Sequence, residues 1–272
     1  MKNHKIYEPD DKMISLISDN YDILQSIGRF GINLGFGDKT VKEVCEDQNV
    51  DTFTFLSVIN FTINGYSQWS DLDKISISTL VQYLRASHVY YLDFELPAIK
   101  RQLAAAVDTT ENLAKLIIKL FDEYAFVISK HMSYEEKTVF PYVDALLNNQ
   151  ATGEYDIETY SKHHDQAEQQ LGEVKTIILK YLPSDAQHNN QLTAALFNIY
   201  NCEEWLKQHA EVEENIFIPA IRCLEENIKQ KDVSANISCM INKRPDRGDT
   251  LSDREKDVIV ALVQGMSNKE IA

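Results

Sequence analysis

The chain has 272 residues and a net charge of −15, from 27 basic and 42 acidic side chains. Apolar residues make up 44% and charged residues 25%, which is ordinary globular usage and argues against disorder or a fibrous repeat. The acidic balance argues against a nucleic-acid or membrane surface built from most of the chain. With 9 Gly and 6 Pro, the chain has too few turn residues for a β-sandwich or barrel, so the composition favours helices.

The N-terminal residues and the cysteines indicate in which cellular compartment the protein is expected. The opening MKNHKIYEPDDKM lacks the apolar region of a secretory signal, and no run of 18 apolar residues follows it. The cysteines show neither a CxxC motif nor a disulfide framework spacing, which is typical of reduced thiols. They are Cys45, Cys202, Cys223 and Cys239. We therefore expect a cytoplasmic protein without a membrane segment.

Residues 1–70 are expected to form a small helical domain. Thr40 and Glu43 form a capping box, and Asp51 is a second N-cap, so two short helices are predicted after them. A glycine-rich loop precedes these helices, but it matches neither GxxxxGK[ST] nor a strand leading into GxGxxG, so nucleotide binding is not favoured. The glycines of this loop are Gly28, Gly31, Gly35 and Gly37.

Residues 76–227 are predicted to form an all-α, up-down bundle of four long helices. The breaks fall near Asp108, residues 148–156 and residues 182–187, and loops of that length join antiparallel neighbours. Apolar residues recur at steps of three and four along each helix, as expected of a core face. The second helix offers Leu113, Ile117, Leu120, Tyr124, Val127, His131 and Glu135, and the third runs from Ile157 and Tyr160 to Tyr181. The fourth offers Leu192, Ala195, Ile199, Cys202, Leu206, His209, Glu213, Ile216 and Ala220.

Each predicted core face carries one histidine, and two of these histidines are followed four residues later by a glutamate. Side chains at i and i+4 stack on one helix face, so each His–Glu pair can bind the same ion. The candidate metal ligands are His88, His131, Glu135, His164, His209 and Glu213. In His163-His164, only His164 falls on the core face.

The two His–Glu pairs lie in matching sequences. His131 begins HMSYEEKTVFP and His209 begins HAEVEENIFIP, with Glu-Glu and Pro at the same positions in both. A lone histidine precedes the first pair by 43 residues and the second by 45. This pattern indicates an internal duplication of a helical hairpin, in which each half offers two His and one Glu.

Two buried glutamates beside four histidines favour a metal centre, because burying an unpaired carboxylate costs several kcal/mol. Six ligands exceed what one tetrahedral zinc needs. With Glu135 and Glu213 bridging, each of two metals would receive two imidazole and two carboxylate atoms, which leaves room for an oxo or hydroxo bridge and one open position. Glu136 and Glu214 are expected to point toward a flank, about 100° away.

Two familiar metal-site motifs are missing at the histidines. Ferritin-like di-iron proteins use ExxH pairs, and metalloproteases use HExxH. The pattern of four His and two Glu resembles instead the hemerythrin-like (HHE) family of four-helix, non-haem di-iron proteins. Within it, the pattern looks most like the RIC or ScdA-like branch, which repairs iron centres. The resemblance covers about residues 76–225 and implies that the six candidate residues bind two iron ions.

The N-terminal segment GDKTVKEVCEDQNVD also resembles the small N-terminal domain of the ScdA-like proteins. That family usually has two adjacent cysteines in the preceding loop, where this chain reads Leu34-Gly35-Phe36-Gly37. The difference argues against a function that needs a thiol pair.

The C-terminal residues differ in character from the rest. Residues 228–250, with KRPDRGD, are expected to be a flexible linker, and residues 251–272 contain two capping boxes separated by Gly265. The string LSDREKDVIVALVQGMSNKEIA resembles the start of a LuxR-type helix-turn-helix, and it stops at Ala272, before the helix that would enter a major groove.

These features favour a non-enzymatic sensor. The di-iron bundle would bind O2 or nitric oxide, or respond to iron or redox state, and a completed LuxR-type unit would bind DNA. A role in iron–sulfur cluster repair under nitrosative stress, and iron or O2 binding without signalling, remain alternatives. The sequence leaves the physiological ligand and the oligomeric state, a homodimer included, open.

Overall fold

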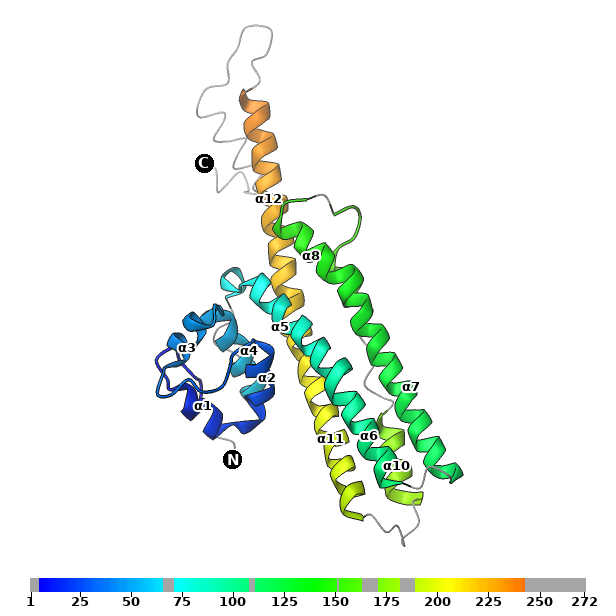
Figure 1. The fold of residues 1–272 in the computed structure, drawn as a ribbon. Coiled ribbons are helices and arrows are strands. Elements are labelled where there is room, and N and C mark those ends of the chain that lie inside the picture. Colours follow the sequence, from blue (N-terminus) through cyan, green and yellow to red (C-terminus); the bar gives the residue numbers. More distant parts are fainter. Residues whose placement is uncertain are drawn as a thin grey trace. The chain divides into compact units, whose positions relative to one another are not determined.

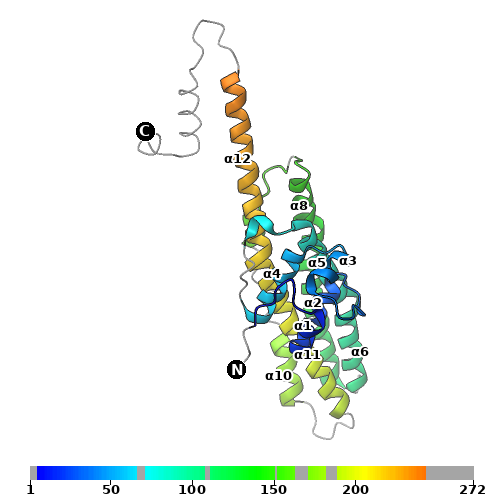
Figure 2. The same ribbon diagram turned by 90° about the vertical axis from the view of Figure 1, so that its left-hand side faces the viewer.

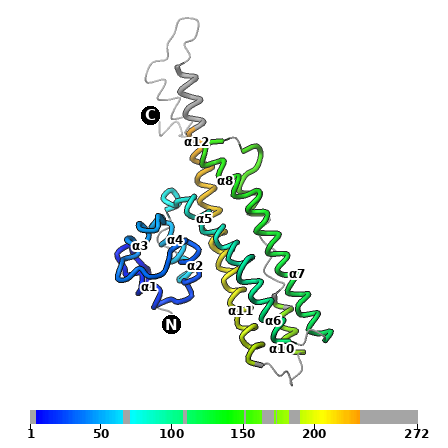
Figure 3. The backbone as a smooth tube through the Cα atoms, viewed as in Figure 1, coloured from blue at the N-terminus to red at the C-terminus, as the bar shows by residue number. Residues whose placement is uncertain are grey.

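The computed structural model describes residues 5–65, 71–107, 111–150, 152–162, 171–181 and 189–242. Within these ranges the elements are helical, and the only β-type pairing is an isolated bridge between Lys12 and Thr40. The prediction of an all-α fold is confirmed. In this part of the chain, no helix combines the length and the apolar character needed to cross a membrane. Figure 3 traces the backbone in chain order.

The N-terminal helices form a compact group, drawn in blue in Figure 1. They are α1 (Met13–Asp19), the 3-10 turn η1 (Tyr21–Ile23), α2 (Leu24–Arg29), α3 (Val41–Asp47) and α4 (Thr52–Asn64). Both predicted caps are present: Thr40 and Glu43 exchange their capping-box hydrogen bonds at α3, and Asp51 accepts from the Thr54 N–H at α4. The loop between α2 and α3 contains Gly31, Gly35 and Gly37, all with positive φ, a conformation that glycine adopts without strain.

Four helical stretches follow, and Figures 1 and 2 show the long helices running alongside one another. The first comprises α5 (Ile77–Val89), η3 (Tyr90–Glu95) and α6 (Leu96–Ala106), after the short 3-10 turn η2 (Leu72–Lys74). The second comprises α7 (Asn112–Tyr134), η4 (Glu135–Val139) and α8 (Phe140–Leu147). The third contains α9 (Ile157–Ser161) and α10 (Leu171–Tyr181). The fourth comprises α11 (Asn189–Val212), η5 (Glu213–Phe217) and α12 (Ile218–Asn242).

The bundle closes because α6 contacts α7, α7 contacts α10, α10 contacts α11 and α11 contacts α6. Every residue of the predicted core face of the fourth helix is buried, from Leu192 to Ala220. Two expectations for the other helices are wrong. The buried face of α7 is centred one residue later, on Phe121 and Ile128 rather than Leu120 and Val127, and Tyr181 at the end of α10 is 65% exposed.

Each of the segments η3, η4 and η5 is a turn of π-helix inside a longer helix. A proline stands second in the α-helix that follows each one: Pro97, Pro141 and Pro219. Because proline has no backbone N–H and its ring crowds the carbonyl four residues earlier, a regular α-helix cannot continue through it. The wider π-turn accommodates the proline, and such turns are frequent at functional sites.

Helix α12 runs on to Asn242, so the first part of the expected 228–250 linker is helical. The segment IKQKDVSANISCMIN contains neither glycine nor proline, which explains why the helix continues. Residues 1–221 form one compact unit and residues 222–272 a second. The expected helix-turn-helix at 251–272 lies outside the described residues.

Arg29 connects the N-terminal helices to the bundle. Its side chain is buried, donates from Nη2 to the Tyr91 hydroxyl at 2.9 Å, and lies over the rings of Tyr90 and Tyr91. Two cation–π contacts and a charge-assisted hydrogen bond thus replace an ion pair for this buried guanidinium. Tyr91 in turn contacts the His209 ring edge-on at 5.9 Å.

We expect Tyr91→Phe to lower the free energy of unfolding by about 1–3 kcal/mol, because it leaves a buried donor of Arg29 without its acceptor. Urea unfolding measures this change. Tyr21→Phe is the control, because the Tyr21 side chain is 74% exposed, and it should change the midpoint little. Equal midpoints for the two variants would show that the hydroxyl contributes nothing.

Candidate metal centre

The π-helical segments lie where the predicted ligands occur. Glu135 is the first residue of η4 and Glu213 the first of η5, each one turn after its histidine. His131 Nε2 lies 3.2 Å from Glu135 Oε1, and His209 Nε2 lies 3.1 Å from Glu213 Oε1. The predicted i, i+4 stacking of both pairs is confirmed.

His88 comes from a third helix, near the C-terminal end of α5. Its Nε2 lies 3.0 Å from Glu135 Oε2, so the Glu135 carboxylate faces an imidazole on each side, from α5 and from α7. The other ring nitrogen of His88, Nδ1, lies 2.9 Å from Glu136 Oε1. Glu136 is partly exposed, as expected of a flanking residue, yet its carboxylate reaches the site.

Four of the six predicted ligands form one buried group. Ligand-type atoms of His88, Glu135, His209 and Glu213 all lie within 4.8 Å of one another. The side chains of both glutamates are 1% exposed and those of the two histidines 3%. His131 lies at the edge of this group, with a side chain 23% exposed. His164 lies outside the described residues, as does His163.

Tyr160 on α9 supports the group from the third helical stretch. Its hydroxyl donates a hydrogen bond to Glu135 Oε1, and the ring is buried against Phe217. Burial and the charges of Glu213 and Glu135 hold the pKa of Tyr160 far above its usual range, so the phenol stays protonated. Tyr160 thereby restricts the orientation of Glu135.

Opposing effects set the charges of the group. Burial and the nearby Glu213 raise the pKa of Glu135, but His131 and His88 outweigh them and leave it lower than usual. Burial lowers the pKa of His88, but the carboxylates of Glu135, Glu213 and Glu136 leave it raised. The neighbouring imidazoles therefore favour an ionised Glu135 carboxylate in a buried position.

Among the described residues, several buried polar atoms of this group make no hydrogen bond of normal geometry: His88 Nε2, Glu135 Oε2, and both ring nitrogens of His209. His88 Nε2 and His209 Nε2 lie within ion-pair distance of a carboxylate oxygen, but neither pair is aligned as a hydrogen bond. Buried polar atoms are nearly always hydrogen-bonded, and groups left without a partner call for an explanation. A cation among them would satisfy these atoms, since imidazole nitrogen and carboxylate oxygen suit iron, manganese and zinc. The donor set therefore fits a metal centre.

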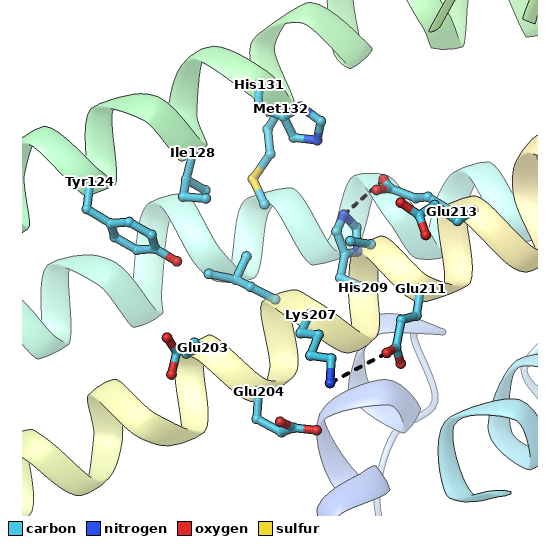
Figure 4. A pocket seen from close by; sticks show the side chains of 13 residues that line it. Tyr124, Ile128, His131, Met132, Glu203, Glu204, Lys207, His209, Glu211 and Glu213 are labelled. Carbon is cyan, nitrogen blue, oxygen red and sulfur yellow. Dashed lines mark ion pairs between the residues drawn. The ribbon is translucent and has the colours of Figure 1, made fainter. Parts of the chain in front are cut away.

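A cavity of about 460 Å³ opens onto the group between α7 and α11. Figure 4 shows Tyr124, Ile128, Met132 and His131 on α7 along one side of the cavity, with His209 and Glu213 on the facing helix. The outer lining on α11 includes the acidic residues Glu203, Glu204 and Glu211. The cavity gives a small ligand or a cation access to His131, His209 and Glu213.

Sequence reasoning did not identify Tyr160 and Glu136 as parts of the site. Tyr160 was expected as an apolar core residue, and no pattern distinguished it from one. For Glu136 there was a signal, because the Glu-Glu pair recurs at 213–214 in the matching segment.

Comparison with known proteins agrees with this geometry. Residues 79–221, more than half of the chain, match the family model of the hemerythrin HHE cation-binding domain. No curated protein and no solved structure matches the chain significantly. The matched range contains the buried His–Glu group and the parts of all four helical stretches that carry it. The chain belongs to the hemerythrin HHE cation-binding family.

Proposed function

We propose that this protein holds a non-haem di-iron centre that senses O2, nitric oxide or the state of iron itself. The observation that carries the proposal is the buried group of His88, Glu135, His209 and Glu213, whose ligand-type atoms lie within 4.8 Å of one another. Its unsatisfied nitrogens and oxygens support a bound cation, and the family match supports iron. The proposed ligands are His88, His131, Glu135, His164, His209 and Glu213.

A bound iron pair supplies one-electron redox chemistry and an open coordination position for a small ligand such as O2 or nitric oxide. The residues of the chain would orient the metal ligands and determine which small ligands reach them. Glu135 lies between imidazoles of two helices and is held by Tyr160, which makes it the proposed bridging residue, with Glu213 as its counterpart. Ile128 and Met132 line the cavity beside the histidines and present an apolar surface to an incoming diatomic ligand.

The N-terminal helices favour sensing over thiol-dependent repair. The loop at residues 34–37 contains no cysteine, and the nearest thiol, Cys45, is fully buried in α3. Burial raises the pKa of Cys45 to about 12, so it is protonated and a poor nucleophile at neutral pH. Repair of iron–sulfur clusters under nitrosative stress, and iron or O2 binding without signalling, remain the competing roles.

Metal analysis combined with an optical spectrum tests the proposal. We expect two iron ions per chain after anaerobic reconstitution with Fe²⁺, and a spectral change on exposure to O2 or nitric oxide. One metal per chain, or tightly bound mononuclear zinc, would contradict a di-iron centre.

The proposed output is a LuxR-type DNA-binding unit that begins at residues 251–272. Acidic side chains dominate the chain before Lys243, so DNA affinity must come from the recognition helix and its basic neighbours. A protein carrying a complete helix-turn-helix is expected to bind specific DNA with an affinity that depends on metal loading. Anisotropy titrations at low salt measure the DNA affinity with and without bound metal. Equal affinities in the two states would favour repair or storage.

A further inference from the structure

Glu136 is not a proposed metal ligand, yet its carboxylate contacts one of the proposed ligands, His88. Its Oε1 lies 2.9 Å from His88 Nδ1, on the side of the ring opposite to the nitrogen that faces Glu135. The two nitrogens of His88 therefore have different roles. Nε2 points into the buried group, and Nδ1 points outward to a carboxylate.

This contact fixes the tautomer of His88. An ionised carboxylate only accepts hydrogen bonds, so Nδ1 must carry the proton that joins it to Glu136. When His88 is neutral, Nε2 then keeps its lone pair and faces the buried group. A carboxylate behind a histidine ligand also makes the imidazole a stronger donor to a metal.

The surroundings hold Glu136 and His88 in this arrangement. The Phe140 ring stacks on the His88 ring, with 5.4 Å between the ring centroids and an interplanar angle of 18°. The guanidinium of Arg85 lies over the Phe140 ring, 5.3 Å from its centroid. Arg85 Nε also lies 3.8 Å from Glu136 Oε2, while its Nη2 bonds Asp144 at 3.1 Å. Ring plane and carboxylate are thus both restrained.

His209 shows that such a carboxylate is not a general feature of the site. Both of its ring nitrogens are buried, and its Nδ1 has no hydrogen-bond partner among the described residues. The outer carboxylate at His88 thus distinguishes it from His209. In the second repeat Glu214 stands at the position of Glu136 and His164 at that of His88, and because His164 lies outside the described residues, the inference concerns Glu136 alone.

We propose that Glu136 is a positioning residue that fixes the tautomer and orientation of His88 for metal binding through Nε2. The inference rests on the proposed metal centre. In it, the Glu136 carboxylate acts on the site by holding His88 and does not bind the metal itself. This role explains why the partly exposed position next to Glu135, on the flank of η4, is a second glutamate.

Glu136→Ala removes the acceptor, and Glu136→Gln keeps an acceptor without the charge. Asp122→Ala is the matched control, because it deletes a partly exposed carboxylate of α7 that pairs with Lys100 rather than with Arg85 or His88. Zn²⁺ titration against a competing chelator measures affinity in the full chain. In the zinc-loaded, diamagnetic protein, the His88 Nδ1–H gives a proton resonance that a carboxylate acceptor shifts downfield and protects from exchange.

We expect Glu136→Ala to weaken zinc binding between about 10-fold and 100-fold and to lose the protected resonance. Glu136→Gln should recover part of the affinity and move the resonance upfield, and Asp122→Ala should match the wild type in both measurements. Zinc affinity of Glu136→Ala within twofold of the wild type would overturn this inference alone, as would an equal loss in Asp122→Ala. A wild-type chain that binds no zinc and no iron would overturn the proposed metal centre with it.

Discussion

Glu135→Ala is expected to abolish the proposed two-metal centre. The Glu135 carboxylate lies 3.0 Å from His88 and 3.2 Å from His131, so it touches an imidazole on each of two helices, and its side chain is fully buried. Removing it deletes a donor that both proposed metal positions share. It also removes the carboxylate that accepts the Tyr160 hydrogen bond. No neighbouring side chain on η4 can replace it, because Glu136 is committed to the outer nitrogen of His88.

Iron content and the optical spectrum after anaerobic reconstitution measure this effect. The wild-type chain should hold two iron ions, and Glu135→Ala should hold at most one and lose the spectral response to O2. Glu123→Ala is the control, since Glu123 is a glutamate of α7 whose side chain is 55% exposed and pairs with Lys119. Two irons retained in Glu135→Ala would rule out Glu135 as a bridging ligand.

The helical architecture was predictable because its signals are local and redundant. Thr40 with Glu43 and Asp51 with the Thr54 N–H mark helix starts through hydrogen bonds to orphan backbone donors, and both caps form. The fourth helix has its apolar residues at steps of three and four, and burial follows that pattern from Leu192 to Ala220. Local stereochemistry and helix periodicity determine both features.

In the second helix, the periodicity of apolar residues does not decide which of them are buried. Leu120 and Phe121 are both apolar, so an apolar stripe can be drawn through either, and the packed structure buries Phe121. Only contacts with the other helices choose between them. The prediction that Tyr181 is buried was wrong for a related reason. A stripe of apolar residues can be extrapolated to the end of a helix, past the point where neighbouring elements cover the helix.

The metal group was predictable to the extent that it depends on i, i+4 pairs. His131 with Glu135 and His209 with Glu213 stack as a helix requires, and His88 joins them from α5. The role of Glu136 was missed because a rotation of 100° per residue was assumed. The π-helical turn begins at Glu135 and has more residues per turn, so Glu136 is rotated less and reaches His88.

Metal loading is expected to raise the unfolding midpoint substantially. Without a cation, Glu135 and Glu213 are two buried carboxylates whose charges repel, and His209 Nδ1 has no hydrogen-bond partner among the described residues. A cation binds the folded group and has no comparable site in the unfolded chain, because the ligands come from separate helices. Binding to the folded state alone stabilises it by about 2.7 kcal/mol when free metal is 100 times its dissociation constant.

Thermal unfolding of the same preparation with and without Fe²⁺, under anaerobic conditions, measures this difference. The comparison within one chain separates metal binding from any effect of a substitution on the fold. Glu213→Gln should be folded without metal, because it removes one of two repelling carboxylates, but its midpoint should rise far less on loading. The metal-free variant can therefore be at least as stable as the metal-free wild type while the loaded variant is less stable. A wild-type midpoint that is unchanged by iron would mean that the buried group is satisfied by protonation and by contacts within the chain, and that it does not bind iron.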